Sequence, residues 1–285
     1  MNIILRTGGP ADAEACGVIC YQAFKSIADQ HGFLSDFPTA ETAIGLMNFI
    51  FSSGAAYSII AEMDGQIVGS NFLWEDDAIA GVGPITINPK TQNSSVGKKL
   101  MEEVLQRAKE QRLAGVRLVQ AAYHNRSLAL YAKLGFEVKE PLSVLQGPAF
   151  NIPLPGYEVR LATEVDLGNC NELCHKVHGH NRSNELIGAI KAGTACVVEH
   201  NGRITGYTSQ LGFFGHTIAK TNNDLKAIIG AATSFSGPGF LLPSRNAEML
   251  VWCLSNGLRI MQPMTLMSKG FYNEPAGAFL PSVLY

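Results

Sequence analysis

Charge is scarce in this 285-residue sequence: only 16% of the residues are Asp, Glu, Lys or Arg, and the formal net charge is −2. Without an excess of positive charge, a chain has no general attraction for nucleic acid or acidic membranes. The sequence also lacks the run of about 18 apolar residues that a membrane-spanning helix requires. Its start lacks the long apolar core of a signal peptide. We therefore expect a cytoplasmic protein that binds neither nucleic acid nor membranes.

The six cysteines include no Cys-x-x-Cys pair. Four of them form two pairs spaced four residues apart, which are Cys16 with Cys20 and Cys170 with Cys174. On a helix this spacing puts both thiols on one face, where free cysteine packs as a small apolar residue. Histidines follow only the second pair, and the spacing does not match the usual zinc pattern of two separated ligand pairs. We expect packed thiols, no disulfides and no metal.

Part of the sequence occurs twice. Four residues recur at one constant offset: Arg6, Asp12, Cys16 and Cys20 as Arg160, Asp166, Cys170 and Cys174. The segment 62–69 recurs as 199–206, and both copies contain Asp-Gly or Asn-Gly, which is typical of a β-hairpin turn. The length also suits two domains. We predict domains at 1–146 and 157–285, joined by a Pro- and Gly-containing linker at 147–156.

The apolar pattern of the first unit predicts a mixed α/β order. The expected elements are a strand at 3–6, helices at 11–24 and 39–51, a hairpin at 58–73, a strand at 82–87, a helix at 95–112, a strand at 116–122, a helix at 127–134 and a final hairpin ending at 146. The helix at 95–112 places Leu100, Met101 and Val104 on one apolar stripe.

The most informative stretch is a strand that leads into a turn of small residues at 92–97 and then into a helix. Unpaired backbone N–H groups and the helix dipole make such a helix start an anion site, and a pyrophosphate would fit there. Lys98 and Lys99 occupy the first turn, where the dipole disfavours cations unless an anion is bound. By itself, the turn could also be an ordinary polar loop with a serine cap.

A second pattern follows, with Asn125, Tyr131 and Gly135-Phe136. Together the two patterns resemble the GNAT superfamily of N-acetyltransferases over about 140 residues. The pyrophosphate loop of that family reads Gln/Arg-x-x-Gly-x-Gly/Ala, and a later helix carries Asn, Tyr and Gly-Phe. Gln92 and Gly97 match the ends of the loop, whereas Ser95 stands where the family usually has its first glycine.

The resemblance implies an α+β fold of two tandem GNAT-like domains, each a twisted, mostly antiparallel sheet flanked by helices and splayed at its middle. It implies a transferase that moves an acetyl group from acetyl-CoA to a primary amine of a small molecule or peptide by direct attack, without a metal. The implied cofactor contacts are Ile85, Ile87, Gln92, Asn93, Ser94, Ser95, Val96, Gly97, Lys98, Lys99, Asn125 and Tyr131.

Two catalytic roles follow from this chemistry. Tyr131 is the candidate acid that protonates the departing thiolate, although a tyrosine on a short amphipathic helix can also be a core residue. The attacking amine needs a base, and Glu75 is the first candidate, although it stands in a run of three acids that is also typical of a solvated loop. His31 and His124 are further candidates.

The second unit lacks a convincing phosphate loop. The segment around Lys220 has no glycine pair, and Asp224 would place a carboxylate near the anion site. Trp252 stands in the place of the tyrosine and cannot donate a titratable proton. We therefore predict a degenerate second domain without acetyl transfer.

The site that binds the acceptor amine is less defined by the sequence. We expect the acceptor cleft between segments 24–51 and 73–81, with contributions from the second unit. The acceptor itself and the oligomeric state stay open, a homodimer being one option. The alternative function is a non-catalytic acyl-CoA sensor or interaction module of the same fold.

Overall fold

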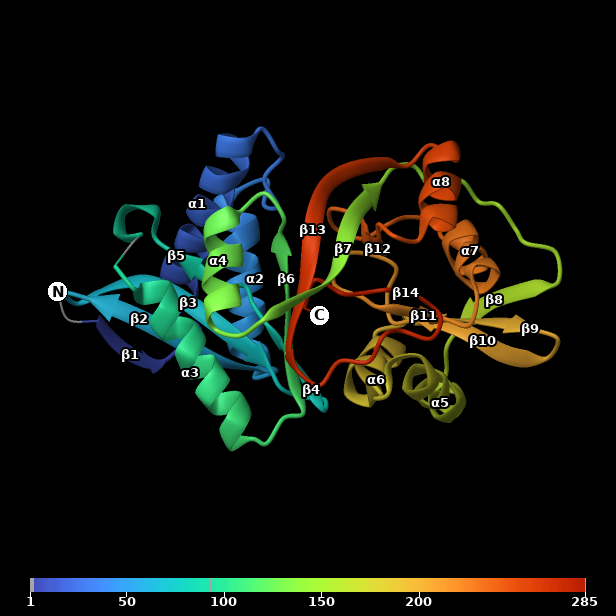
Figure 1. Ribbon diagram of the computed structural model, residues 1–285, viewed down its shortest axis with the longest axis horizontal. Coiled ribbons are helices and arrows are strands. Elements are labelled where there is room, and N and C mark those ends of the chain that lie inside the picture. Colours follow the sequence, from blue (N-terminus) through green and yellow to red (C-terminus); the bar gives the residue numbers. More distant parts are fainter. Residues whose placement is uncertain (1–2, 93, 285) are drawn as a thin grey trace.

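The computed structural model describes residues 3–92 and 94–284, which form two lobes joined by long strands (Figure 1). The first half contains β1 (Ile3–Thr7), α1 (Ala13–His31), α2 (Ala40–Ser53), β2 (Ala56–Met63), β3 (Gln66–Trp74), β4 (Ile79–Val82), β5 (Thr86–Ile87), α3 (Val96–Glu110), β6 (Gly115–Ala121), α4 (Asn125–Lys133) and β7 (Glu137–Gln146). The second half contains β8 (Tyr157–Leu161), α5 (Leu167–His178), α6 (Ser183–Lys191), β9 (Cys196–His200), β10 (Arg203–Thr208), β11 (Thr217–Ala219), α7 (Asn222–Ala231), β12 (Phe240–Pro243), α8 (Ala247–Ser255), β13 (Arg259–Gly270) and β14 (Ala278–Leu280). The predicted mixed α/β fold is confirmed, and within the described ranges no helix is both long and apolar enough to cross a membrane.

The two predicted hairpins are β2–β3 and β9–β10, both antiparallel. Their turns have positive φ at both central residues, 51° and 76° at Asp64 and Gly65, and 51° and 69° at Asn201 and Gly202. Asp, Asn and Gly tolerate this left-handed conformation, which matches the twist of the flanking strands. The local sequence therefore determines both hairpins.

The internal repeat appears as a repeated ion-pair network. In each half, an arginine on the first strand binds an aspartate before the first α-helix and a glutamate on the second strand. The distances are 2.7 and 2.7 Å for Arg6 with Asp12 and Glu62, and 2.8 and 2.6 Å for Arg160 with Asp166 and Glu199. The recurring cysteines of α1 and α5 lie buried as free thiols. The two halves thus have the same local construction.

Strands of the two halves pair in one large sheet. Its order is β1-β2-β3-β4-β6-β13-β7-β12, with β5 also paired to β3, and a second sheet has the order β14-β11-β10-β9-β8. Although β13 belongs to the second half, it lies between β6 and β7, with Met264 opposite both Ala121 and Leu142. In turn, β7 pairs with β12, with Leu145 opposite Phe240. The halves therefore exchange strands, as Figure 1 shows at the centre of the molecule.

This exchange overturns one sequence prediction. The expected hairpin ending at 146 is a single strand, β7, whose neighbours are both from the second half. A pairing between strands that are roughly 100 residues apart leaves no turn signal in the local sequence, so the predicted hairpin is wrong.

The expected strand at 82–87 is also wrong in detail. In its place the structure has two strands, β4 and β5. They are separated by residues 83–85, where the Gly83–Pro84 peptide is cis. Proline has no N–H to donate to a sheet ladder, which accounts for the interruption.

Helices cover both faces of the large sheet. On one face, Leu100 and Val104 of α3 pack in a core that includes Ile59 of β2. On the other face, α1 and α2 pack in a core that includes Ile60. Because successive strand residues point to opposite faces, α3 and the α1–α2 pair lie on opposite sides of the sheet.

Candidate functional site

The predicted anion site lies at the start of α3. Ser95 precedes the helix with φ 65°, and no side chain of a described residue caps the helix. A non-glycine residue in this left-handed region carries backbone strain, which explains why a glycine would be favoured here. Asn93, another predicted contact, lies outside the described residues. First-turn N–H groups that no side chain of a described residue caps are the feature that an anion requires.

The charges of this helix start also suit an anion. The first turn contains no acid, and Lys98 pairs with Glu102 one turn later, at 3.5 Å. Gln92 accepts a 2.7 Å hydrogen bond from Arg126 Nη1, which ties the loop to the start of α4. Arg126 is not among the residues predicted from the sequence, although its position next to Asn125 was a usable signal.

Close packing brings the loop, β5 and α4 together. A Cβ atom at Gly97 would lie 3.2 Å from Ile87 Cδ1 and 3.6 Å from Leu130 Cδ2. Ile85 packs against the same core. The predicted contacts Ile85, Ile87 and Gly97 are therefore near one another, and α4 begins beside them at Asn125, whose preceding residue, His124, holds the cap position.

Tyr131 projects from α4 into the core between the sheet and α3. It is 6% exposed, and its ring meets that of Phe136 edge-on with the centroids 6.1 Å apart. Burial raises the pKa of its phenol well above the ordinary value of about 10. The phenol is therefore protonated at neutral pH, the form in which it can donate a proton.

The sheet opens beside this core. Strands β4 and β6 pair in parallel only over Ile79–Gly81 and Gly115–Arg117. Further along, β5 pairs with β3, and no described residue of β5 pairs with β6. The splay that the resemblance implied thus lies between β5 and the second half of β6.

Glu75 lies away from the loop. Its carboxylate accepts hydrogen bonds of 2.6 and 3.0 Å from Arg107 Nη2 and Nε, and the Arg107 guanidinium lies over the ring of Tyr57. Arg107 is 11 residues after Val96, about 16 Å along the helix axis. Glu75 and Gly97 therefore flank opposite ends of α3.

The loop between α1 and α2 forms a cluster of polar side chains with the end of β6. Asp36 accepts a 2.8 Å hydrogen bond from Gln262 Nε2, and Tyr123 donates at 3.1 Å to Gln262 Oε1. Phe33 stacks on Tyr123 with the ring centroids 4.3 Å apart. Burial raises the pKa of Asp36, although the Gln262 hydrogen bond opposes it, and burial raises the pKa of Tyr123 to about 12. Asp36 was missed because its partner is 226 residues away.

The two histidine candidates lie at this same end of β6. The His31 ring centroid is 5.2 Å from that of Tyr123, and His124 directly follows Tyr123. Burial lowers the pKa of His124, and the charges of Arg126 and His31 lower it further. A neutral imidazole at His124 is the form that can accept a proton.

The equivalent helix start in the second half is closed. The carboxylate of Asp224 accepts hydrogen bonds from Thr221 N and Oγ1 at 2.9 and 2.6 Å, while Thr221 Oγ1 accepts from Asp224 N. This capping box places a negative charge where α3 has none. Trp252 packs edge-on against Phe150 with the ring centroids 5.1 Å apart. The capping box closes the start of α7, Trp252 is a core residue, and the loss of acetyl transfer in the second half stays a prediction.

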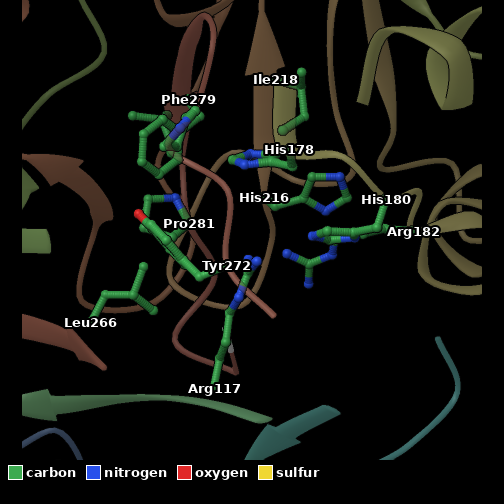
Figure 2. Close-up of a pocket in the computed structure, with 12 residues that line it drawn as sticks. Arg117, His178, His180, Arg182, His216, Ile218, Leu266, Tyr272, Phe279 and Pro281 are labelled. Atoms are coloured by element: carbon green, nitrogen blue, oxygen red, sulfur yellow. The ribbon is translucent and has the colours of Figure 1, made fainter. Parts of the chain in front are cut away.

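A separate small pocket lies between the halves, where Arg117 of β6 faces His178, His180 and Arg182 (Figure 2). His216, beside them, is bonded to Glu185 and to Tyr207, both at 2.8 Å. Burial lowers the pKa of each of the three histidines, that of His180 to about 4. Among the residues that the structure describes, no group of His, Cys, Asp or Glu could hold a metal ion.

One comparison with known proteins finds a match that lies in the first half of the chain. The sequence profile of the acetyltransferase (GNAT) family matches residues 20–136. No curated protein matches the chain.

Solved structures are similar over the whole chain. An acetyltransferase-like protein from Pyrococcus horikoshii is 15% identical, covers 97% of this chain and 94% of its own, and superposes with a TM-score of 0.74. A GCN5-related N-acetyltransferase from Sphaerobacter thermophilus is 13% identical over 95% and 96% of the chains, with a TM-score of 0.64. A tandem GNAT protein from the clavulanic acid biosynthesis pathway is 13% identical over 99% and 100%, with a TM-score of 0.55. At these identities the likeness concerns the fold: the chain has the tandem GNAT fold.

Proposed function

We propose that the chain transfers an acetyl group from acetyl-CoA to a primary amine of a small molecule or peptide, since residues 20–136 match the sequence profile of the acetyltransferase (GNAT) family. The observation that supports this most is the open start of α3, joined by Gln92 and Arg126 to the helix of Tyr131. One anion site and one buried proton donor are thereby attached to the same splayed sheet.

In this proposal the pyrophosphate of acetyl-CoA binds the first-turn N–H groups of α3, as anions do at helix N-termini. The contacts come from Gln92, Ser94, Ser95, Val96 and Gly97, with Lys98, Lys99 and Asn125 around them. The pantetheine arm then enters the splay along Ile85 and Ile87. No acid is present in the first turn of α3 to repel it.

The acetyl transfer proceeds by direct attack. The neutral amine nitrogen bonds to the thioester carbonyl carbon, the C–S bond breaks, and the thiolate takes the phenol proton of Tyr131. The proton lost by the amine passes to a base, and the phenolate regains a proton from solvent. Burial raises the pKa of the Tyr131 phenol, which keeps it protonated but makes it a weaker acid. A thiolate buried in the same splay would have a raised pKa for the same reason, so the proton transfer stays feasible.

We retain Glu75 as the proposed base, and its contacts define how to test it. The carboxylate must exchange part of its bonding to Arg107 for the amine or for a relaying water. Glu75→Gln should lower kcat about 100-fold if the carboxylate is the base. A matched variant, Glu103→Gln, changes the nearby acid that binds Tyr57 and should leave kcat unchanged. Equal activity of both variants would remove Glu75 from the mechanism and leave His124 as the next candidate.

A non-catalytic acyl-CoA sensor is the second candidate function. The engagement of Glu75 by Arg107 favours it, because an ion pair then occupies the carboxylate that is proposed as the base. Two measurements separate the candidates. Calorimetry with CoA reports binding, and thiol release from acetyl-CoA over a panel of amines and peptides reports transfer. Binding without release on any acceptor would establish the sensor, and absence of binding would reject both.

A further inference from the structure

Asp36 is a carboxylate without a cation partner in a largely apolar setting. It lies half-buried on the α1–α2 loop, and among residues 3–92 and 94–284 no Lys, Arg or His forms an ion pair with it. Its Oδ1 accepts from Gln262. Its Oδ2 forms no hydrogen bond with a described residue and is not sealed from solvent. A carboxylate that is removed from bulk water and has an open oxygen is suited to a cationic ligand.

The carboxylate is held in place from the other half of the chain. Gln262 belongs to β13, the strand that the second half inserts into the large sheet, and it is 4% exposed. Since the Tyr123 hydroxyl donates to Gln262 Oε1, the amide turns its Nε2 toward Asp36. A single amide therefore fixes Asp36 relative to the end of β6.

Aromatic rings lie beside this group. Phe33 stacks on Tyr123 at 4.3 Å, and Phe37 meets Phe24 edge-on at 5.3 Å. Rings of this kind accommodate the apolar part of a ligand and, through their faces, a neighbouring cation.

Asp36 also lies where an acceptor could meet the cofactor of the proposed site. The α1–α2 pair lies on the sheet face opposite to α3. A thioester that reaches the splay from the α3 side would therefore be met by an acceptor from the side of Asp36. Both sites adjoin the same end of β6, where Tyr123 contacts Gln262 and Arg126 contacts Gln92.

We propose that Asp36, positioned by Gln262, binds the ammonium group of the acceptor and so selects cationic amines with an apolar or aromatic body. This inference rests on the proposed acetyl transfer. It makes Asp36 a specificity-determining residue that binds the acceptor before the amine loses its proton, and it gives the second half a direct part in acceptor recognition through Gln262.

The test compares two probes that differ in charge. Calorimetry on the full chain with saturating CoA measures the dissociation constants of 2-phenylethylamine and 2-phenylethanol. We expect the amine to bind wild type at least tenfold more tightly than the alcohol, because only the amine gains a charge-assisted hydrogen bond. Asp36→Asn should abolish the preference, Asp36→Glu should keep part of it, and Gln262→Leu should weaken it.

Asp29→Asn is the matched control, since Asp29 lies exposed near the end of α1 and pairs only with Lys25. It should retain the full preference. A wild type that binds both probes equally, a wild type that binds neither, or an amine preference that survives in a folded Asp36→Asn variant would overturn the proposal. Melting curves of each variant establish folding. CoA titrated alone gives a separate result: if CoA does not bind but the Asp36-dependent amine preference is present, the acetyl transfer fails and the amine site stands.

Discussion

Tyr131 combines burial with a hydroxyl that a purely apolar core would not need. Phenylalanine in its place keeps the ring contact with Phe136 and removes only the proton. We expect Tyr131→Phe to lower kcat about 100-fold, with little change in the KM for acetyl-CoA and a stability change within about 1 kcal/mol. Thiol-release kinetics check the first two quantities, and chemical denaturation the third. Tyr157→Phe, on β8, is the control; equal rates for both variants would make Tyr131 a structural residue.

A charged Asp36, which the proposed acceptor site requires, lowers the stability of the fold. Burial raises its pKa, so the folded state binds the Asp36 proton more tightly than the unfolded chain does. Such a group stabilises the fold at pH values below its ordinary pKa of about 3.9. This contribution is lost as the pH rises through the pKa that the group has in the folded state. Asp36→Asn does not titrate. We therefore expect the variant to melt above wild type at pH 7 and the difference to shrink as the pH falls toward 4. A difference independent of pH in melting experiments would contradict this.

At the scale of elements, the start of α3 differs from the start of α7 in its cap. Ser95 adopts a left-handed conformation that glycine adopts without strain. We expect Ser95→Gly to raise the free energy of unfolding by up to about 1 kcal/mol and to leave acetyl-CoA binding intact. Denaturation and calorimetry on the same preparation test this. Loss of binding in a stabilised variant would instead assign the Ser95 hydroxyl to the cofactor.

At the scale of the whole molecule, the exchange of β7 and β13 joins the halves. A fragment of residues 1–146 would leave the edge of β6 and both edges of β7 without their partners, because β13 and β12 are missing. Unpaired sheet edges promote aggregation. We expect this fragment to aggregate alone and to form a soluble complex when co-expressed with residues 147–285. Size-exclusion chromatography distinguishes the two, and a stable monomer of 1–146 would contradict the account.

The local parts of this structure could be predicted from the sequence. The Asp-Gly and Asn-Gly turns, the apolar stripe of α3 and the repeated Arg–Asp spacing each follow from neighbours within a few residues. The contacts that define the site join distant segments instead: Gln92 with Arg126, Glu75 with Arg107, and Asp36 with Gln262. One sequence contains no local signal for such pairs, nor for the insertion of β13. For this reason the sequence singles out individual residues for the proposed cofactor side, but for the amine side only candidate bases and the broad segments 24–51 and 73–81.

The chain has the GNAT fold twice, and we propose that it binds one cofactor, at the start of α3. Calorimetric titration with acetyl-CoA measures the number of sites. The second position of each helix gives a matched pair of variants, Gly97→Glu on α3 and Asn223→Glu on α7. We expect one molecule bound per wild-type chain, no binding to Gly97→Glu and unchanged binding to Asn223→Glu. Two molecules per chain, or binding that survives Gly97→Glu and is lost in Asn223→Glu, would show that the cofactor site is not at the start of α3 alone.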